Sequence, residues 1–443
     1  MEPIISVSGL RGVVGETLTP TVICRYMAAF AAELPPGPIV VGRDGRTTGP
    51  ALAEIVRGAL AAMGRDVIDL NVAATPTVGV MVRKLEAAGG VQISASHNPP
   101  PYNGLKLFNG EGRVIPAAAG EKVVANYRAD RAAWAPFDRL GFIEFRRSLN
   151  AAHLELVLKT VDLPAIRRRR FQVVLDANHG SGAVLGRTLL LELGCRVTIL
   201  GEEPSGKFSH PPEPTADNLA GVRSQLHGAD VCFCQDPDAD RLALIDETGR
   251  YVGEEYTPAI CIEQVLRQTP GPIVTNCATS RMSQDLAEKY GAPFYRSAVG
   301  EANVVDLMKE KQAVFGGEGN GGPIDPRVGY VRDSFVGMAL VLAAMAERKL
   351  PLSQLVDALP KYEIRKTSFP LSREVLPAAF EKLQGLFPEA TVSTQDGLRL
   401  DWPDRWLIVR GSNTEPIVRA IAEAPRGEDA TTLCEAARKV MSD

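Results

Sequence analysis

The chain has 443 residues, of which 45% are hydrophobic and 23% are charged, and its formal net charge at pH 7 is −4. This balance is typical of a soluble globular protein of roughly three domains, because a domain holds about 150 residues. The charge gives no support for nucleic-acid binding, and no apolar stretch reaches the roughly 20 residues that span a bilayer.

Strand and helix signals alternate through the first three quarters of the chain. Short apolar runs rich in valine and isoleucine indicate buried strands, and amphipathic stretches between them indicate helices. The first cycle predicts a strand at 39–42, a helix at 51–63, a strand at 67–70 and a helix at 77–85. Similar cycles at 171–200 and 273–315 predict three related α/β units in tandem.

The last part of the chain has a different pattern. Strands are predicted at 362–369, 397–401, 406–410 and 417–423, and helices at 373–386 and 430–441. Short strands with hairpin connections and two helices predict a smaller α+β domain. We therefore expect three α/β domains, at 1–145, 146–245 and 246–360, followed by an α+β domain at 361–443.

One serine stands out in the first unit. Ser96 follows the strand-like run 90–93 and precedes an asparagine and three prolines, which predicts a rigid loop with an available hydroxyl. His97 is its neighbour, and Lys106 follows Tyr102-Asn103-Gly104, which has the composition of a turn. A hydroxyl, an imidazole and an ammonium so close together suit phosphoryl transfer. From this stretch alone, a proline-rich surface loop with an exposed serine is an equal alternative.

Three carboxylates alternate with other residues after the apolar run 231–234. Alternate residues of an extended loop point the same way, so Asp236, Asp238 and Asp240 should converge. Converging carboxylates favour a hard divalent cation between them, Mg²⁺ first. A calcium-binding EF-hand fits poorly, because Arg241 takes the place of its glycine. A solvated acidic loop without a metal is the stronger alternative.

Four motifs, in their order along the chain, resemble the α-D-phosphohexomutases, which include phosphoglucomutase, phosphomannomutase and phosphoglucosamine mutase. The motifs are SASHNP at 94–99, the loop 236–241, GGEGNGG at 316–322 and RGSNTEP at 410–416. The resemblance covers essentially the whole chain. It implies three related α/β domains and a smaller fourth domain around a central cleft.

The resemblance also implies the catalytic residues. Ser96 would carry a phosphoryl group, and Mg²⁺ would be held by an oxygen of that group together with Asp236, Asp238 and Asp240. Lys106 and His97 would transfer protons, with Lys106 favoured by its position in the family. The remaining catalytic residues would be Arg11, in contact with the phosphate on Ser96, and Arg241, as electrostatic support.

Two further loops would bind the substrate. Glu318 and Asn320 would hold the sugar hydroxyls, although Asn320 and Gly322 replace the serine and histidine of the commonest pattern, as in archaeal-type members. Arginine can bind a phosphate in bidentate fashion, and hydroxyl, amide and backbone N–H groups add donors. The predicted clamp for the nonreacting phosphate consists of Arg410, Ser412, Asn413, Thr414 and Arg419.

The implied reaction interconverts a hexose 6-phosphate and a hexose 1-phosphate through a phosphoserine and a bisphosphorylated sugar, with a hexose 1,6-bisphosphate as primer. Phosphoglucosamine mutase is the first choice, and a phosphomannomutase or phosphoglucomutase of mixed specificity is the alternative. A phosphatase would have little need of a separate phosphate clamp. A non-catalytic sugar-phosphate sensor would explain the altered residues of the loop 316–322, called the sugar loop below, but not the intact Ser96 and Lys106.

The seven cysteines are scattered and lie mostly within apolar runs, which is typical of reduced core residues of an intracellular protein. The first residues lack the pattern of a signal peptide. We therefore expect a cytoplasmic protein. Its expected partners are small sugar phosphates, without nucleic acid or membrane, and we expect a monomer or homodimer.

Overall fold

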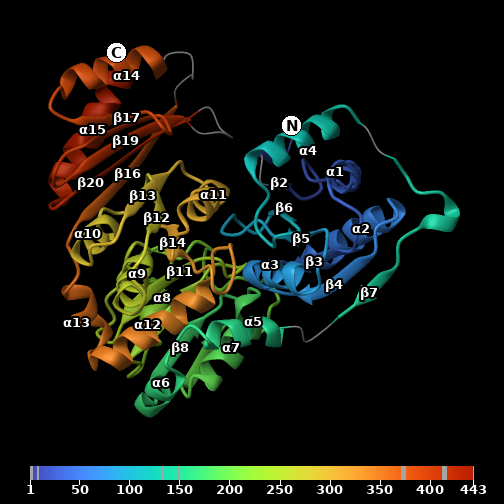
Figure 1. Ribbon diagram of the computed structural model, residues 1–443, viewed down its shortest axis with the longest axis horizontal. Helices are drawn as coiled ribbons and strands as arrows, with labels where there is room; N and C mark the ends of the chain where they lie inside the picture. The colour runs from blue at the N-terminus through green and yellow to red at the C-terminus, as the bar shows by residue number, and fades with distance from the viewer. Residues whose placement is uncertain are drawn as a thin grey trace.

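The computed structural model describes residues 3–6, 9–130, 133–146, 150–370, 376–411 and 417–442. These residues form four sheets, each with its own helices, and the four units follow one another around the molecule (Figure 1). The first three sheets mix parallel and antiparallel strands, and the last is antiparallel. The predicted fold class is therefore confirmed.

The first sheet has seven strands in the order β1-β2-β6-β5-β3-β4-β7. The strands are β1 (Ile4–Ser6), β2 (Gly9–Val13), β3 (Ile39–Arg43), β4 (Val67–Val72), β5 (Gly89–Ile93), β6 (Tyr102–Asn109) and β7 (Ile143–Phe145). The helices are α1 (Pro20–Glu33), α2 (Gly49–Ala62), α3 (Thr75–Lys84) and α4 (Ala117–Arg128), with the short 3₁₀ helix η1 (Phe137–Arg139). The strand β6 corrects one prediction, because Tyr102, Asn103 and Gly104 begin this strand and do not form a turn.

The second sheet has the order β11-β10-β8-β9 and the third the order β13-β12-β14-β15. The second unit contains β8 (Gln172–Asp176), β9 (Arg196–Leu200), β10 (Val231–Gln235), β11 (Leu242–Asp246), α5 (Asn150–Leu158), α6 (Leu163–Arg169), α7 (Gly182–Glu192) and α8 (Ala220–Arg223). The third contains β12 (Ile273–Asn276), β13 (Phe294–Ser297), β14 (Phe315–Glu318), β15 (Gly322–Ile324), α9 (Tyr256–Gln268), α10 (Met282–Lys289), α11 (Glu301–Lys311), α12 (Ser334–Arg348) and α13 (Leu352–Asp357).

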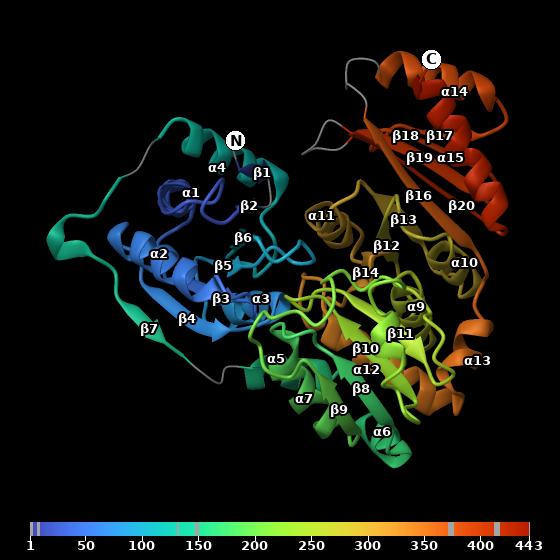
Figure 2. The same ribbon diagram turned by 180° about the vertical axis from the view of Figure 1, so that it is seen from behind.

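The fourth sheet has the order β16-β20-β19-β18-β17. Its strands are β16 (Glu363–Pro370), β17 (Thr391–Ser393), β18 (Leu398–Asp401), β19 (Trp406–Gly411) and β20 (Ile417–Ala424). Two helices, α14 (Leu376–Leu386) and α15 (Gly427–Ser442), complete the unit. It lies across a gap from the first unit in both ribbon views (Figure 2).

The first three sheets repeat one topology. In each, three parallel strands are followed by an antiparallel strand that forms a hairpin with the third. The common order is fourth, third, first, second, as in β6-β5-β3-β4, β11-β10-β8-β9 and β15-β14-β12-β13. The predicted internal repetition is therefore structural, and the hairpin loops after β5, β10 and β14 occupy equivalent places.

The second and third units share one hydrophobic core. The helix α12 is apolar almost all round and is buried along nearly its whole length, as expected of a core helix. Leu175 and Phe233 of the second unit and Ile273 and Phe315 of the third belong to the same buried cluster as this helix. The loops after β10 and β14 are therefore held in a fixed relation to each other. The domain boundaries near 145, 245 and 360 stay predictions.

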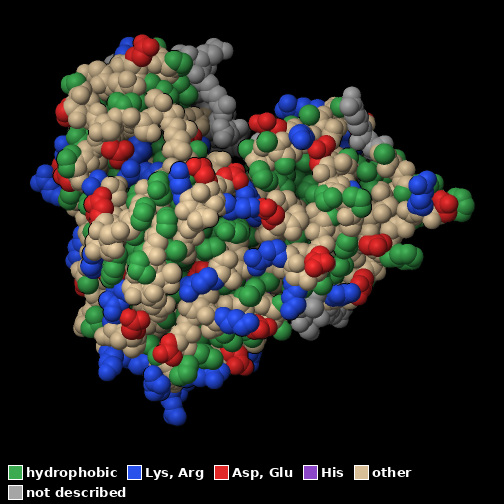
Figure 3. Space-filling view, viewed as in Figure 1, with side chains coloured by type: hydrophobic (Ala, Val, Ile, Leu, Met, Phe, Trp, Pro, Cys, Tyr) green, Lys and Arg blue, Asp and Glu red, His purple; other side chains and the backbone are tan. Residues whose placement is uncertain are grey.

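The visible surface carries Lys and Arg side chains interspersed with Asp and Glu, without a large field of one sign (Figure 3). Among the described residues, we find no helix with the length and apolar character needed to cross a membrane.

Candidate active site

The equivalent hairpin loops of the three repeats converge on one site. The loop after β5 carries Ser96, the loop after β10 carries the three aspartates, and the loop after β14 carries Asn320. Ser96 Oγ donates a hydrogen bond of 2.6 Å to Asp236 Oδ2, and Lys106 Nζ donates to Asp240 Oδ2 at 2.6 Å. Residues far apart in sequence are thus joined by direct side-chain contacts.

Ser96 lies in a constrained loop. Its φ of +49° is in the left-handed region, which a residue with a side chain adopts only when its surroundings hold it there. Ser96 lines a cavity of about 260 Å³, and its Oγ lies 3.3 Å from His97 Nδ1. The predicted rigid loop is present, with the serine facing the cavity from a position where only 2% of the residue is exposed.

A buried arginine holds this loop from within. The guanidinium of Arg46 donates to the backbone carbonyls of Ser96 at 2.6 Å, Asn98 at 2.5 Å, Pro99 at 3.0 Å and Tyr102 at 2.9 Å. Asp44 pairs with the same guanidinium at 3.2 Å. The chain therefore turns before Tyr102, and the strand β6 starts where the last of these bonds is made.

We expect Arg46→Lys to lower kcat about 100-fold with little change in KM. A lysine has no planar fork to bind four carbonyls, so the serine would shift from its position. The matched control is Arg43→Lys, because Arg43 bonds to Asn71 and to the Asp44 carbonyl and touches none of the four. Steady-state kinetics on both variants test this role, and an unchanged kcat in Arg46→Lys would refute it.

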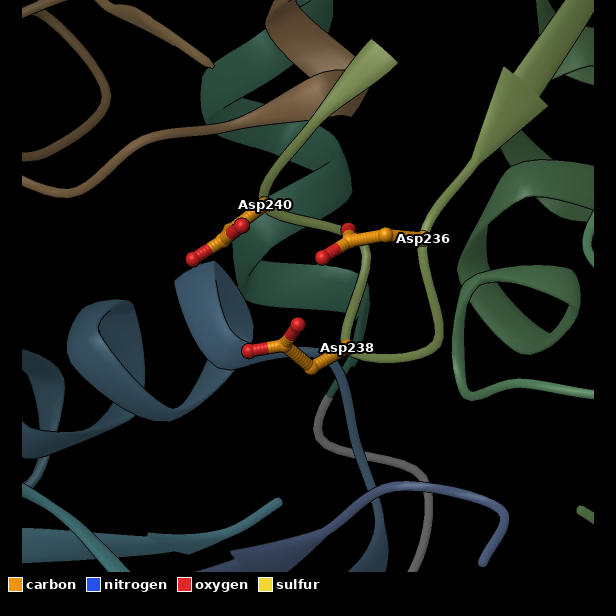
Figure 4. A group of neighbouring side chains, drawn as sticks. All are labelled: Asp236, Asp238 and Asp240. Atoms are coloured by element: carbon orange, nitrogen blue, oxygen red, sulfur yellow. The ribbon is translucent and has the colours of Figure 1, made fainter. Parts of the chain in front are cut away.

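The three aspartates form a compact acidic group. Asp236, Asp238 and Asp240 are fully buried, and each offers an oxygen within 4.8 Å of the others (Figure 4). Asp238 Oδ1 and Asp240 Oδ1 are buried without a hydrogen-bond partner. Orphaned carboxylate oxygens in this arrangement fit a hard divalent cation with oxygen ligands.

Cations already surround part of the group. Lys106 Nζ lies 3.2 Å from Asp238 Oδ2 and 2.6 Å from Asp240 Oδ2. Burial opposes ionisation of Asp238, but Lys106, hydrogen bonds with Thr75 and Asp236, and Arg332 together outweigh it and lower the pKa of that carboxyl. Burial and the neighbouring carboxylates Asp238 and Asp240 raise the pKa of Asp236. Burial opposes the charge of Lys106, but Asp238, Asp240 and Glu301 together outweigh it and raise the pKa of the ammonium, which therefore stays charged.

Arg332 is a site residue that the sequence analysis missed. Its guanidinium donates to Asp240 Oδ2 at 2.6 Å and to Glu318 Oε2 at 2.8 Å, and lies 3.3 Å from Glu301 Oε2. It therefore ties the aspartate loop to the sugar loop. Arg332 stands alone in the loop before α12, and its only sequence signal is the N-cap pattern of the Asp333 that follows it.

The predicted catalytic residues around Ser96 lie beside the cavity. His97 and Arg11 line it, and Arg11 Nη1 donates to Asn98 Oδ1 at 3.0 Å. Burial, together with Arg241 and Arg11, lowers the pKa of His97 to about 2, so its imidazole is neutral. The Arg241 backbone N–H donates to Asp236 Oδ1 at 3.1 Å. The expected group of serine, histidine, lysine and arginines is brought together.

A second, larger cavity of about 680 Å³ adjoins the first, and Arg11, His97, Arg241 and Arg419 line its walls. The sugar-loop residues Glu318 and Asn320 also line it. Glu318 Oε1 accepts from Asn276 Nδ2 at 2.8 Å and from the Gly300 N–H at 3.2 Å. The loop that contains Gly300, which joins β13 to α11, is therefore attached to Glu318 as well.

Glu255 lines the same cavity behind the sugar loop. Its Oε2 accepts a hydrogen bond of 2.9 Å from the Ser280 N–H, and its Oε1 is buried without a partner. Burial, only partly offset by Lys366, raises the pKa of Glu255 to about 8. Gly319 is in contact range of this carboxylate, so a side chain at 319 would collide with it.

Stability is expected to fall as the pH rises from about 4.5 to about 8, because the folded chain keeps the Glu255 proton that the unfolded chain releases. Glu255→Gln should remove this loss and be more stable than the parent by about 1–3 kcal/mol at alkaline pH, with no difference in acid. Denaturation at several pH values checks this, with Glu121→Gln as an exposed control. An equal pH slope in parent and Glu255→Gln would contradict it.

The predicted phosphate clamp is placed only in part. Arg419 of β20 lines both cavities, whereas Arg410 Nε lies 3.1 Å from Asp396 Oδ2. Asp396 Oδ2 in turn accepts from the Val299 N–H at 2.9 Å, so Arg410 lies where the fourth unit meets the third. Ser412, Asn413 and Thr414 lie outside the described residues.

The chain matches the four domain models of the phosphoglucomutase/phosphomannomutase family, with domain I at 4–133, domain II at 151–249, domain III at 254–362 and the C-terminal domain at 368–440. The chain belongs to this family. Membership confirms the resemblance noted from the motifs, and it makes the chain a phosphohexomutase, an isomerase-class phosphotransferase.

Relatives of this phosphohexomutase match it along nearly their whole length. A phosphoglucomutase/phosphomannomutase of Thermococcus kodakarensis is 34% identical over 449 residues, which cover 98% of this chain and 97% of the relative. A protein of Methanopyrus kandleri named "Probable phosphoglucosamine mutase" is 32% identical, with coverage of 96% and 95%.

Solved structures of the family have the same architecture. A phosphoglucomutase/phosphomannomutase family protein of Burkholderia thailandensis is 25% identical and has a TM-score of 0.86. The match covers 99% of this chain and 98% of the Burkholderia protein. The N-acetylphosphoglucosamine mutase of Aspergillus fumigatus in complex with GlcNAc-6P and magnesium is 15% identical, with a TM-score of 0.56 and coverage of 95% and 99%. This second likeness concerns the fold alone.

Proposed function

We propose that this phosphohexomutase interconverts hexose 6-phosphate and hexose 1-phosphate by way of a phosphorylated Ser96. The observation that carries the proposal is the contact of Ser96 Oγ with Asp236 Oδ2, at 2.6 Å, inside a group of three buried carboxylates and two cations. A serine in such a place can exchange a phosphoryl group while opposite charges balance the charge that moves.

The aspartates would hold Mg²⁺ together with an oxygen of phosphorylated Ser96, and the orphaned oxygens of Asp238 and Asp240 support this assignment. When bound, the ion would neutralise charge on the phosphoryl group. His97, whose Nδ1 lies 3.3 Å from Ser96 Oγ, would be one of the two groups that transfer protons. Lys106 keeps its proton against the two carboxylates and is the group suited to protonate Ser96 Oγ as the phosphate leaves.

The sugar would pass through a bisphosphorylated form, with a hexose 1,6-bisphosphate as primer. Reversal of the sugar between the two transfers needs space, and the adjoining cavities of about 260 and 680 Å³ offer it beside Ser96. Arg11 and Arg241 would balance the charge of the reacting phosphate. The nonreacting phosphate would bind the clamp of Arg410, Ser412, Asn413, Thr414 and Arg419, and Glu318 and Asn320 would bind the hydroxyls.

Phosphoglucosamine mutase is our first choice of sugar specificity, and the name of the Methanopyrus relative supports it. The Thermococcus relative, named for glucose and mannose phosphates, supports mixed specificity as the second candidate. We further propose a cytoplasmic location, since the seven cysteines are free thiols. The partners would be small sugar phosphates, without nucleic acid, and the chain would act as a monomer or homodimer.

Phosphorus NMR of the purified, primed protein with Mg²⁺ tests the activity on glucosamine, glucose and mannose 6-phosphates. Conversion to the 1-phosphate without release of free phosphate is expected, and the order of rates names the sugar. Release of inorganic phosphate alone would favour a phosphatase. Binding without turnover of any of the three sugars would favour the sensor and refute the proposal for these substrates.

A chelator is expected to stop turnover, and added Mg²⁺ to restore it. Because Mg²⁺ would bind the folded chain and not the unfolded chain, a Mg²⁺ concentration of about 100 Kd should also raise the free energy of unfolding by about 2.7 kcal/mol. Asp238→Asn should lose this response to Mg²⁺, while the exposed Asp217→Asn should keep it. Thermal melts with and without the ion provide the measurement, and a melting temperature independent of Mg²⁺ would argue against the site.

A further inference from the structure

The segment 133–146 concentrates apolar side chains at the surface. It contains η1 and β7 and runs along the outer margin of the first unit in both ribbon views. Of the eleven exposed large hydrophobic side chains among the described residues, six lie here: Trp134, Phe137, Leu140, Phe142, Ile143 and Phe145. Phe137 is 92% exposed and Phe142 80%, and such clustering marks an interaction surface.

The strand β7 also presents an open edge. It pairs only with β4, and β7 is the last strand of its sheet. The Val67 N–H donates to the Phe142 carbonyl at 2.8 Å, and the Arg146 N–H donates to the Asp69 carbonyl at 2.9 Å. The backbone N–H and C=O groups of even-numbered residues face β4, so those of Ile143 and Phe145 point outward. This edge can therefore pair with another strand.

We propose that β7 pairs antiparallel with β7 of a second copy of this chain, with the two-fold axis at Phe145. Phe145 then exchanges both hydrogen bonds with its own counterpart, as its outward N–H and C=O require. The same register sets Glu144 opposite Arg146 of the second copy, twice in each dimer. A register shifted to centre on Glu144 would place two glutamates opposite each other, so charge favours the first arrangement.

The charges of the segment also favour a second copy over a membrane surface. Asp138 and Glu144 balance Arg139 and Arg146, so the described segment has no net charge. Surfaces that bind anionic membranes carry an excess of Lys and Arg around their apolar groups. A balanced, self-complementary strip suits a two-fold interface instead.

The proposed interface leaves the active site untouched. In the seven-stranded sheet, β7 is at one edge, while β2, β6 and β5, which carry Arg11, Lys106 and the Ser96 loop, are toward the other. Each copy should therefore keep its turnover when the dimer is separated. A failure of the dimer proposal can thus be told apart from a failure of the proposed activity.

Sedimentation equilibrium on the full chain and two charge variants tests the interface. E144R and R146E each place like charges opposite each other twice, and each should raise the dimer dissociation constant about tenfold or more. An equimolar mixture of the two variants should form a heterodimer with the affinity of the parent. Both variants lose the 2.6 Å Glu144–Arg146 pair within the strand, so its loss cannot explain a recovery on mixing.

Both side chains are about half exposed, and circular dichroism and per-subunit activity should match the parent. Hydrogen exchange at the Phe145 amide should slow as the parent concentration rises. A parent that stays monomeric to about 100 µM would overturn the proposal, as would a dimer that neither variant weakens. Flotation of a monomeric parent with phosphatidylserine vesicles would overturn it in favour of a membrane.

Discussion

Replacement of Ser96 by alanine is expected to lower kcat about 10⁴-fold or more, because the proposed transfer needs the Ser96 hydroxyl to accept the phosphoryl group. The serine hydroxyl makes the 2.6 Å contact with Asp236, and Arg46 holds its carbonyl, so its position is set from both sides. Sugar phosphate binding should persist in the variant. Phosphorus NMR for turnover and mass spectrometry for the phosphopeptide provide the two measurements.

The matched control is Ser224→Ala, which changes an exposed serine after α8. It should keep both the turnover and the phosphopeptide that contains Ser96. Turnover by the Ser96→Ala protein at a rate near that of the parent would exclude a phosphoserine at this position. Phosphate found on another residue in the active parent protein would exclude it as well.

Arg332→Ala is expected to lower the free energy of unfolding by about 3–5 kcal/mol. Only 7% of the Arg332 residue is exposed. Its guanidinium faces the carboxylates of Asp240, Glu318 and Glu301. Its removal leaves buried negative charge without its main counterion and separates the aspartate loop from the sugar loop. Turnover should fall together with stability.

Denaturant unfolding followed by circular dichroism measures this loss. The control is Arg426→Ala, because Arg426 forms an exposed ion pair with Asp429 and such pairs contribute about 0.2–1 kcal/mol. A cost in Arg332→Ala as small as that of the control would mean that water reaches the carboxylates and replaces the guanidinium. Such a result would argue against Arg332 as the link between the two loops.

Local patterns were enough to predict the repeated strands and helices, because short apolar runs such as 39–42 and 231–234 form buried strands. The same reasoning failed at Tyr102–Gly104, where asparagine and glycine are not turn residues. A Cβ at Gly104 would lie 2.5 Å from the Leu10 carbonyl oxygen, so this glycine permits close packing of β6 against β2. The preceding prolines make the turn instead.

Within the candidate site, sequence motifs identified the groups that a loop presents, such as Ser96 and the aspartates. They did not identify Arg332, because its partners are 92, 31 and 14 residues away and no local pattern reports them. Nor did they indicate that Glu255 lies behind the sugar loop. Long-range ion pairs depend on how the units pack, and only the folded chain reveals that packing.

The equivalent hairpins of the three α/β repeats have a consequence for how such a protein arises. An ancestral unit, duplicated and duplicated again, would bring three copies of one loop face to face before any of them had a specialised task. Each copy could then diverge in its loop while its sheet was conserved by the demands of the core. The loops that carry Ser96, the three aspartates and Asn320 would, in this view, be three descendants of a single loop.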